Sequence, residues 1–189
     1  MNIEPHYSFN HRADMKFDIA AENNATLLCR LGSRTFIQAF RAMNNPKDFD
    51  AYLSRAFSLH AISAEIEDRC AEFFVAFAED EPAGYFKLYA GSAPGCVTAQ
   101  PTIEIARLYA LENWWGRGVG DVMMEKILSL TRHKGFATLW LSSWKKNDRG
   151  NAFYRKWGFE AVGEQTFTIG RDVQQDFIMS RSTKWIPDS

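Results

Sequence analysis

Three glycines, Gly116, Gly118 and Gly120, stand within five positions of the stretch WWGRGVGD. An apolar run rich in strand-forming residues precedes them and a segment of helical periodicity follows, so the order is strand, turn, helix. Glycine loses much conformational entropy on folding and adds no packing, so this run indicates a tight turn or a close approach of backbone to a ligand. Free N–H groups and the positive end of a helix dipole would meet there, as a phosphate requires.

Two familiar phosphate loops do not fit this stretch. No Gly-Lys-Ser or Gly-Lys-Thr follows the glycines, and GRGVGD lacks the G-x-G-x-x-G spacing of dinucleotide-binding folds. A nucleotide hydrolase is therefore the least favoured enzyme class, because the lysine, the hydroxyl and the acidic partners for magnesium are missing.

Composition limits the partners that the chain can have. The 189 residues are 46% hydrophobic, which predicts one folded domain over residues 15–189. Residues 1–14 contain no apolar run and are expected to form a flexible leader. With 22 basic and 23 acidic residues, neither a nucleic acid nor a membrane is indicated as a partner. The three cysteines and four histidines suggest reduced thiols, a cytoplasmic location and no metal site.

Apolar periodicity predicts the order of the elements. Strands are expected at 15–20, 72–79, 83–90, 101–111, 136–143, 159–162 and 176–181, and helices at 21–40, 46–57, 63–71, 119–135 and 147–157. Asn45 is the expected N-cap of the second helix, with Pro46 at its first position. Because two adjacent strands lead into a third that meets the glycine loop, a mixed α/β, or α+β, domain is favoured over a wholly parallel one.

A second motif stands at a fixed distance beyond the glycine loop. The stretch NDRGNAFYRKWGF, residues 147–159, has an asparagine at a helix start, a tyrosine seven residues later and a Trp-Gly-Phe exit into a strand. Together with IEIARLYALENWWGRGVG, it resembles the GNAT superfamily of acetyl-CoA-dependent N-acetyltransferases over residues 15–182. This resemblance implies a GNAT fold: a mixed, mostly antiparallel sheet of six to seven strands, flanked by helices, with splayed central strands.

The resemblance also implies where acetyl-CoA, the co-substrate, would bind. The backbone at the end of the strand before the loop would bond the acetyl carbonyl and the pantetheine arm, which Asn147 would also contact. The strand-end residues are Leu108, Tyr109 and Ala110, and the residues that would hold the pyrophosphate are Trp115, Gly116, Arg117, Gly118, Val119 and Gly120.

Two positions depart from the family pattern. Trp115 stands where Arg or Gln is usual, which would shift a phosphate contact onto Arg117 or the loop amides. Gly150 stands where Ala is common and is expected to loosen the helix that holds the cofactor arm.

Two residues are candidates for catalysis. A neutral amine is needed for attack on the thioester, and deprotonating an amine of pKa near 10.4 at pH 7 costs roughly 4–5 kcal/mol, so a base is expected. Glu104 lies in the strand where family members with a glutamate base carry it; an ion pair with a neighbour such as Arg107 is the alternative. By resemblance, Tyr154 would donate a proton to the departing thiolate, or else would only pack on the cofactor, and it is also counted among the cofactor-binding residues.

A narrower resemblance points to the acceptor. The segments TFIQAF, LWLSSWKKN and FTIGRDVQQDFIM look like those of the bacterial PaiA-type acetyltransferases, which acetylate spermidine and spermine. A polyamine acceptor is thus expected, with a protein amino group, another small amine or a non-catalytic acyl-CoA sensor as alternatives. Trp144 is a candidate for the acceptor cleft, and a homodimer is implied only by resemblance. Five acidic residues of the predicted helices at 46–57 and 63–71, here called the helical front, either bind cations of the acceptor or form a solvated helix face. They are Asp48, Asp50, Glu65, Glu67 and Asp68.

Overall fold

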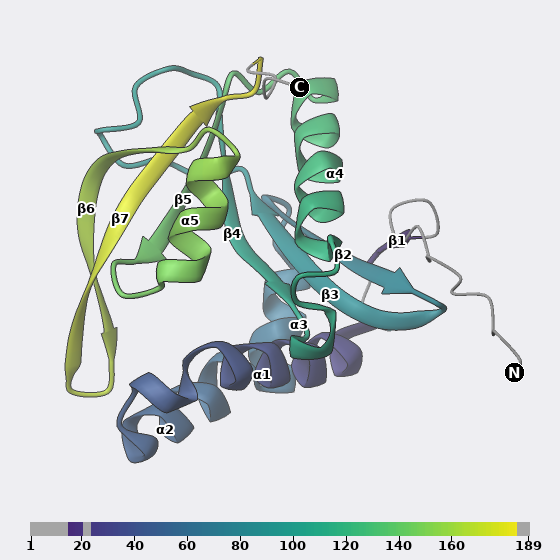
Figure 1. The fold of residues 1–189 in the computed structure, drawn as a ribbon, viewed down its shortest axis with the longest axis vertical. Coiled ribbons are helices and arrows are strands. Elements are labelled where there is room, and N and C mark those ends of the chain that lie inside the picture. Colours follow the sequence, from purple (N-terminus) through teal and green to yellow (C-terminus); the bar gives the residue numbers. More distant parts are fainter. Residues whose placement is uncertain (1–14, 21–23, 185–189) are drawn as a thin grey trace, which may run out of the picture.

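The computed structural model describes residues 15–20 and 24–184 (Figure 1). Its strands are β1 (Lys16–Ile19), β2 (Ala71–Ala78), β3 (Glu81–Tyr89), β4 (Thr102–Ala110), β5 (Thr138–Trp144), β6 (Glu160–Ile169) and β7 (Asp172–Ser182). Its helices are α1 (Ala25–Phe40), α2 (Pro46–Ala56), α3 (Leu59–Glu67), α4 (Val119–His133) and α5 (Asp148–Lys156), with short 3-10 turns η2 (Arg41–Met43) and η3 (Glu112–Trp114). The predicted leader, residues 1–14, lies outside this range.

The described strands form one sheet of order β1-β2-β3-β4-β5-β7-β6. Only β4 and β5 run parallel; every other neighbouring pair is antiparallel. The expected fold, a mixed and mostly antiparallel sheet flanked by helices, is confirmed. The β4–β5 pairing covers only Thr102 to Glu104, although β4 continues to Ala110, so the two central strands separate beyond Glu104.

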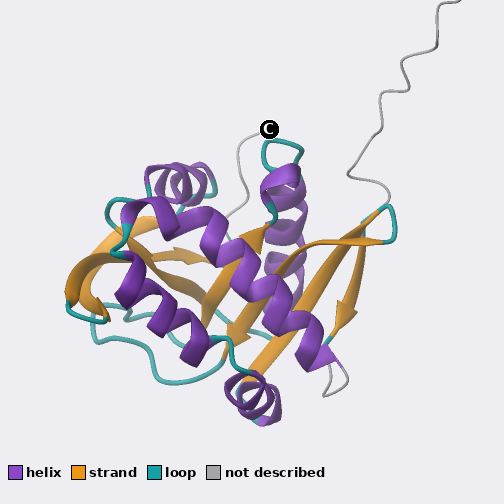
Figure 2. Ribbon diagram, turned by 90° about the horizontal axis from the view of Figure 1, so that it is seen from below, coloured by secondary structure: helices purple, strands orange, loops and turns teal. Residues whose placement is uncertain are grey.

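Helices cover both faces of the sheet (Figure 2). Successive strand residues project to opposite faces, and β3 shows this directly. A Cβ built on Gly84 would lie 3.1 Å from the Met123 side chain of α4, whereas the hydroxyl of the next residue, Tyr85, lies 3.2 Å from the Cβ position of Gly32 in α1. We therefore name the two sides the α4 face and the α1 face.

Local capping fixes where the helices of the α1 face begin. The Asn45 side chain accepts hydrogen bonds from the backbone N–H groups of Lys47 and Asp48, which confirms the predicted start of α2. The third helix was predicted at 63–71, which is wrong at both ends. It starts at Leu59, because the Ser58 side chain caps it by accepting from Ala61 N–H, and the chain enters β2 by residue 71.

The last two strands are longer than predicted. The sequence pattern predicts them at 159–162 and 176–181, but β6 and β7 form a continuous hairpin that turns at Gly170, whose φ is +60°. Their polar residues look like loop residues in the sequence because most of β6 is exposed. The hairpin meets the helical front, where Gln174 Nε2 donates to Asn44 Oδ1 at 2.7 Å and the Phe167 and Tyr52 rings lie 5.7 Å apart.

Across residues 15–20 and 24–184, no helix combines the length and apolar character that a membrane span needs.

Candidate active site

The glycine loop combines left-handed backbone with close packing. Gly116 and Gly118 have φ values of +73° and +83°, which L side chains rarely adopt, and Gly118 is the N-cap of α4. Gly120 has no positive φ, but a Cβ there would approach the Phe153 ring of α5 to 3.3 Å. Since Gly118 offers no capping side chain, the first-turn N–H groups of α4 remain available to an anion.

The cation that lies beside this loop is Arg149, whereas the sequence indicated Arg117. The guanidinium of Arg149 stacks on the Trp115 ring, with Cζ 3.3 Å from the ring centre, while Trp115 Nε1 donates to Ala110 O at 2.8 Å. Both side chains line the cleft that opens where β4 and β5 separate. Arg117 is exposed, lies over Trp114 and does not line the cleft.

Asn147 lies at the start of α5, as predicted, and caps it. Its Oδ1 accepts from the Gly150 N–H at 3.1 Å. A Cβ on Gly150 would come within 2.3 Å of the Asn147 amide, so glycine accommodates this cap instead of merely loosening the helix.

The separation of β4 from β5 opens a cleft of about 680 Å³. Its lining includes most of the residues singled out in the sequence: Glu104, Leu108, Tyr109, Ala110, Trp115, Gly116, Gly118, Gly120, Trp144, Asn147 and Tyr154. Arg117 and Val119 are not among the lining residues, and the Val119 side chain is buried in the core. Tyr109 and Trp144 contact Phe40 of α1, whereas Tyr154 is on α5, so the cleft reaches residues of both faces.

The two candidate catalytic groups have altered acidity. Burial raises the pKa of Tyr154 to about 12, so its phenol keeps its proton at neutral pH. Burial also raises the pKa of Glu104, with the charge of Lys87 opposing the rise. A carboxylate of raised pKa is a stronger base, which suits proton abstraction from an ammonium.

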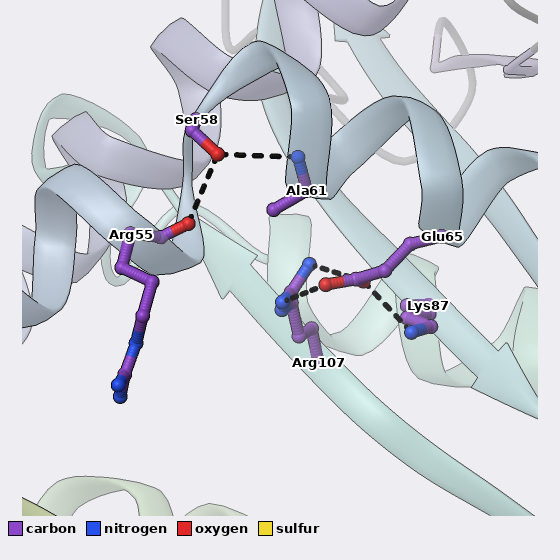
Figure 3. A network of polar contacts seen from close by, with 6 residues as sticks. All are labelled: Arg55, Ser58, Ala61, Glu65, Lys87 and Arg107. Atoms are coloured by element: carbon purple, nitrogen blue, oxygen red, sulfur yellow. Dashed lines mark hydrogen bonds and ion pairs between the residues drawn. The ribbon is translucent and has the colours of Figure 1, made fainter.

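Arg107 is paired with Glu65 and not with Glu104, the alternative that the sequence left open. Its guanidinium makes two hydrogen bonds to Glu65 of α3, at 2.8 and 2.9 Å, and Lys87 also donates to Glu65 at 2.8 Å (Figure 3). Within the described residues Glu104 makes no ion pair, so the alternative of a Glu104–Arg107 pair is wrong. The Glu104 carboxyl is left to face the cleft.

The acids of the helical front do not line the cleft. Asp50 pairs with Arg41, Asp48 lies near Arg171, Glu65 holds the network just described, and Glu67 and Asp68 are exposed. The acidic cleft residues are instead Glu104, Asp121 and Asp176. Asp121 is already engaged, because its Oδ1 accepts from Lys156 and from Trp157 Nε1.

Arg149 and Asp176 were not anticipated as cleft residues. Asp176 begins the predicted strand DFIMSR, and Arg149 lies inside the NDRGNAFYRKWGF motif without being part of its signature. Burial and stacking of these side chains depend on segments distant in the chain, so no local pattern reveals them.

Comparison with known proteins fits this geometry. A model of the acetyltransferase (GNAT) family matches residues 36–159, more than half of the chain. The chain belongs to the GNAT family. A GNAT enzyme transfers an acetyl group from acetyl-CoA to an amine, and the loop, the splayed strands and Tyr154 lie in the part of this GNAT domain that the family model covers.

Relatives of this GNAT protein bear the same general name. It is 27% identical over 152 residues to an uncharacterized N-acetyltransferase of Lactobacillus delbrueckii subsp. lactis, covering 80% of this chain and 88% of that one. It is 26% identical over 158 residues to an uncharacterized N-acetyltransferase of Mycobacterium tuberculosis, covering 84% and 97%.

Solved structures share the fold. The PaiA N-acetyltransferase of Thermoplasma acidophilum, in complex with coenzyme A, aligns with a TM-score of 0.71 and 17% identity over 89% of this chain and 99% of that one. An aminoglycoside 6'-acetyltransferase type Ii aligns with a TM-score of 0.63 and 16% identity over 91% and 99%.

Proposed function

We propose that this GNAT enzyme acetylates a primary amine of a small polyamine. The observation that carries the proposal is that the β6–β7 hairpin bounds the cleft on the α1 face, where it contacts the helices through Gln174–Asn44 and Phe167–Tyr52. A long peptide needs a groove that is open along its length, whereas a short flexible amine fits a cleft that these contacts bound on one side. The resemblance of the segments TFIQAF, LWLSSWKKN and FTIGRDVQQDFIM to the PaiA-type acetyltransferases agrees with a polyamine acceptor.

Acetyl-CoA would enter from the α4 face. The N–H groups at the start of α4 would bind the pyrophosphate, and Arg149, stacked on Trp115, would supply the cation that the family pattern places at position 115. The pantetheine arm would pass Asn147 and lie in the gap between β4 and β5, against the backbone of Leu108 to Ala110.

The acceptor amine would enter from the α1 face. Glu104 would take a proton from the ammonium, directly or through water, and the free amine would attack the thioester carbonyl. The new C–N bond forms as the C–S bond breaks, and Tyr154 would donate its proton to the leaving sulfur. The nitrogen would release its second proton as the amide forms, and this proton would restore the Tyr154 phenol. The products are the acetylated amine and free coenzyme A.

Release of free thiol from acetyl-CoA tests the proposal. Spermidine and spermine should give saturable release, with kcat/KM at least about tenfold above that for a lysine peptide or an aminoglycoside. Faster turnover of the peptide would instead favour a protein acceptor, and faster turnover of the aminoglycoside a drug-like amine. Coenzyme A binding without turnover of any amine would favour an acyl-CoA sensor. A homodimer and a cytoplasmic location stay predictions from the sequence.

A further inference from the structure

A buried carboxyl group lines the acceptor side of the cleft. Asp176 of β7 is 7% exposed, and its Oδ2 accepts from Ser142 Oγ at 2.8 Å. Ser142 Oγ in turn accepts from Gln165 Nε2 at 2.8 Å, so the hydroxyl is held in place. The second oxygen, Asp176 Oδ1, is buried and has no hydrogen-bond partner among the described residues.

The described part of the chain supplies no cation to this carboxyl. The nearby Lys145 pairs with Glu164, and Lys146 lies over the Trp144 ring. Burial raises the pKa of Asp176, and the hydrogen bond from Ser142 only partly opposes the rise. An ionised carboxylate that is buried without a partner is costly, so the free oxygen in the cleft indicates a cationic ligand.

The cross-strand register places this group relative to Glu104. Glu104 is paired with Trp140 in β5, and Ser142 follows two residues later, or roughly 7 Å along the strand. Ser142 shares its face of β5 with Trp144, whose ring contacts Phe40 of α1, so Asp176 and its hydroxyl partner lie on the α1 face.

Two carboxyl groups therefore line one cleft at different depths along β5. We propose that Asp176 binds a second, non-reacting ammonium group of the acceptor, through Oδ1, while the reacting amine lies at Glu104. This inference rests on the proposed function, because it specifies how an amine acceptor is selected. It implies that the acceptor carries two cationic groups separated by a short alkyl chain, since a single amine leaves Asp176 Oδ1 without a cationic partner.

The test compares cadaverine with pentylamine, which has the same carbon chain but one amine. Isothermal titration calorimetry on the wild-type enzyme saturated with coenzyme A should show cadaverine binding at least about tenfold more tightly, or about 1.4 kcal/mol. Asp176→Asn should abolish that preference and leave pentylamine affinity unchanged. The matched control Glu160→Gln removes an exposed carboxylate from the same hairpin and should change neither affinity.

Three results would overturn the inference: no preference for cadaverine in the wild type, a preference that survives in Asp176→Asn, or an equal loss of both ligands. The first needs no variant, so it decides the matter even if Asp176→Asn fails to fold. A purely structural role would also lower the melting temperature of Asp176→Asn, whereas we expect it to be unchanged or higher. Because the assay measures binding, a preference for cadaverine together with no turnover of spermidine, spermine or any other amine would reject the proposed function and keep the ammonium site.

Discussion

The guanidinium of Arg149 lies against the Trp115 ring, its Cζ 3.3 Å from the ring centre. Arg149 is at the start of α5 and Trp115 opens the glycine loop, so the stack joins two elements that flank the cofactor side of the cleft. Trp115, which replaces the Arg or Gln of the family pattern, thus brings the cation of Arg149 to the loop from another part of the chain.

We expect Arg149→Ala to raise the Kd for coenzyme A about tenfold, because a charge-assisted contact to phosphate would be lost. Arg149→Lys should recover only part of the affinity, since lysine keeps the charge but not the planar stack. Calorimetry at low and high salt would measure this. Arg155→Ala removes an exposed cation from the same helix as the control, and an equal effect from it would show that only net charge matters.

Tyr154→Phe should lower kcat about tenfold and leave the KM for acetyl-CoA almost unchanged. The reason is that phenylalanine has no proton to donate to the leaving sulfur, whereas the Tyr154 phenol, whose pKa burial raises to about 12, stays protonated throughout the neutral range. Steady-state kinetics with varied acetyl-CoA would separate the two parameters. A raised KM with normal kcat would mean that the ring only packs on the cofactor.

Glu104→Gln should lower kcat/KM at pH 7 by about 100-fold. Burial raises the pKa of Glu104 above its ordinary 4.5, so the wild-type rate should fall as the pH drops through that raised pKa and the base takes up a proton. The variant should lack this acid limb and regain activity as the pH approaches the pKa of the amine, near 10.4. An unchanged pH profile in the variant would exclude Glu104 as the base.

Gly118→Ala should lower the free energy of unfolding by about 1–2 kcal/mol, because φ of +83° is strained for alanine. For a chain of this length the melting temperature should fall by about 2–8 °C. Gly95→Ala is the control, since Gly95 has no positive φ and a Cβ there meets nothing within 4 Å. Thermal denaturation by circular dichroism measures both, and equal melting temperatures would show that the loop relaxes without cost.

The sequence was informative wherever the cause is local. The glycines at 116 and 118 are explained by positive φ, Asn45 and Asn147 by capping, and the start of α4 by apolar spacing. The third helix begins before the predicted segment 63–71 because its cap, Ser58, precedes that segment. The final hairpin was underestimated because its exposed polar residues resemble a loop.

The sequence by itself therefore determined the class of sheet, the strand, loop and helix of the cofactor side, and the order of Glu104 and Tyr154 in the chain. Only the tertiary structure decided that Arg107 pairs with Glu65, that Arg149 stacks on Trp115, and that Asp176 is buried beside Ser142. These contacts join residues 34 to 42 positions apart. Strand register and helix packing bring such residues together, so a carboxyl group that looks like a strand end in the sequence becomes a buried group in the cleft.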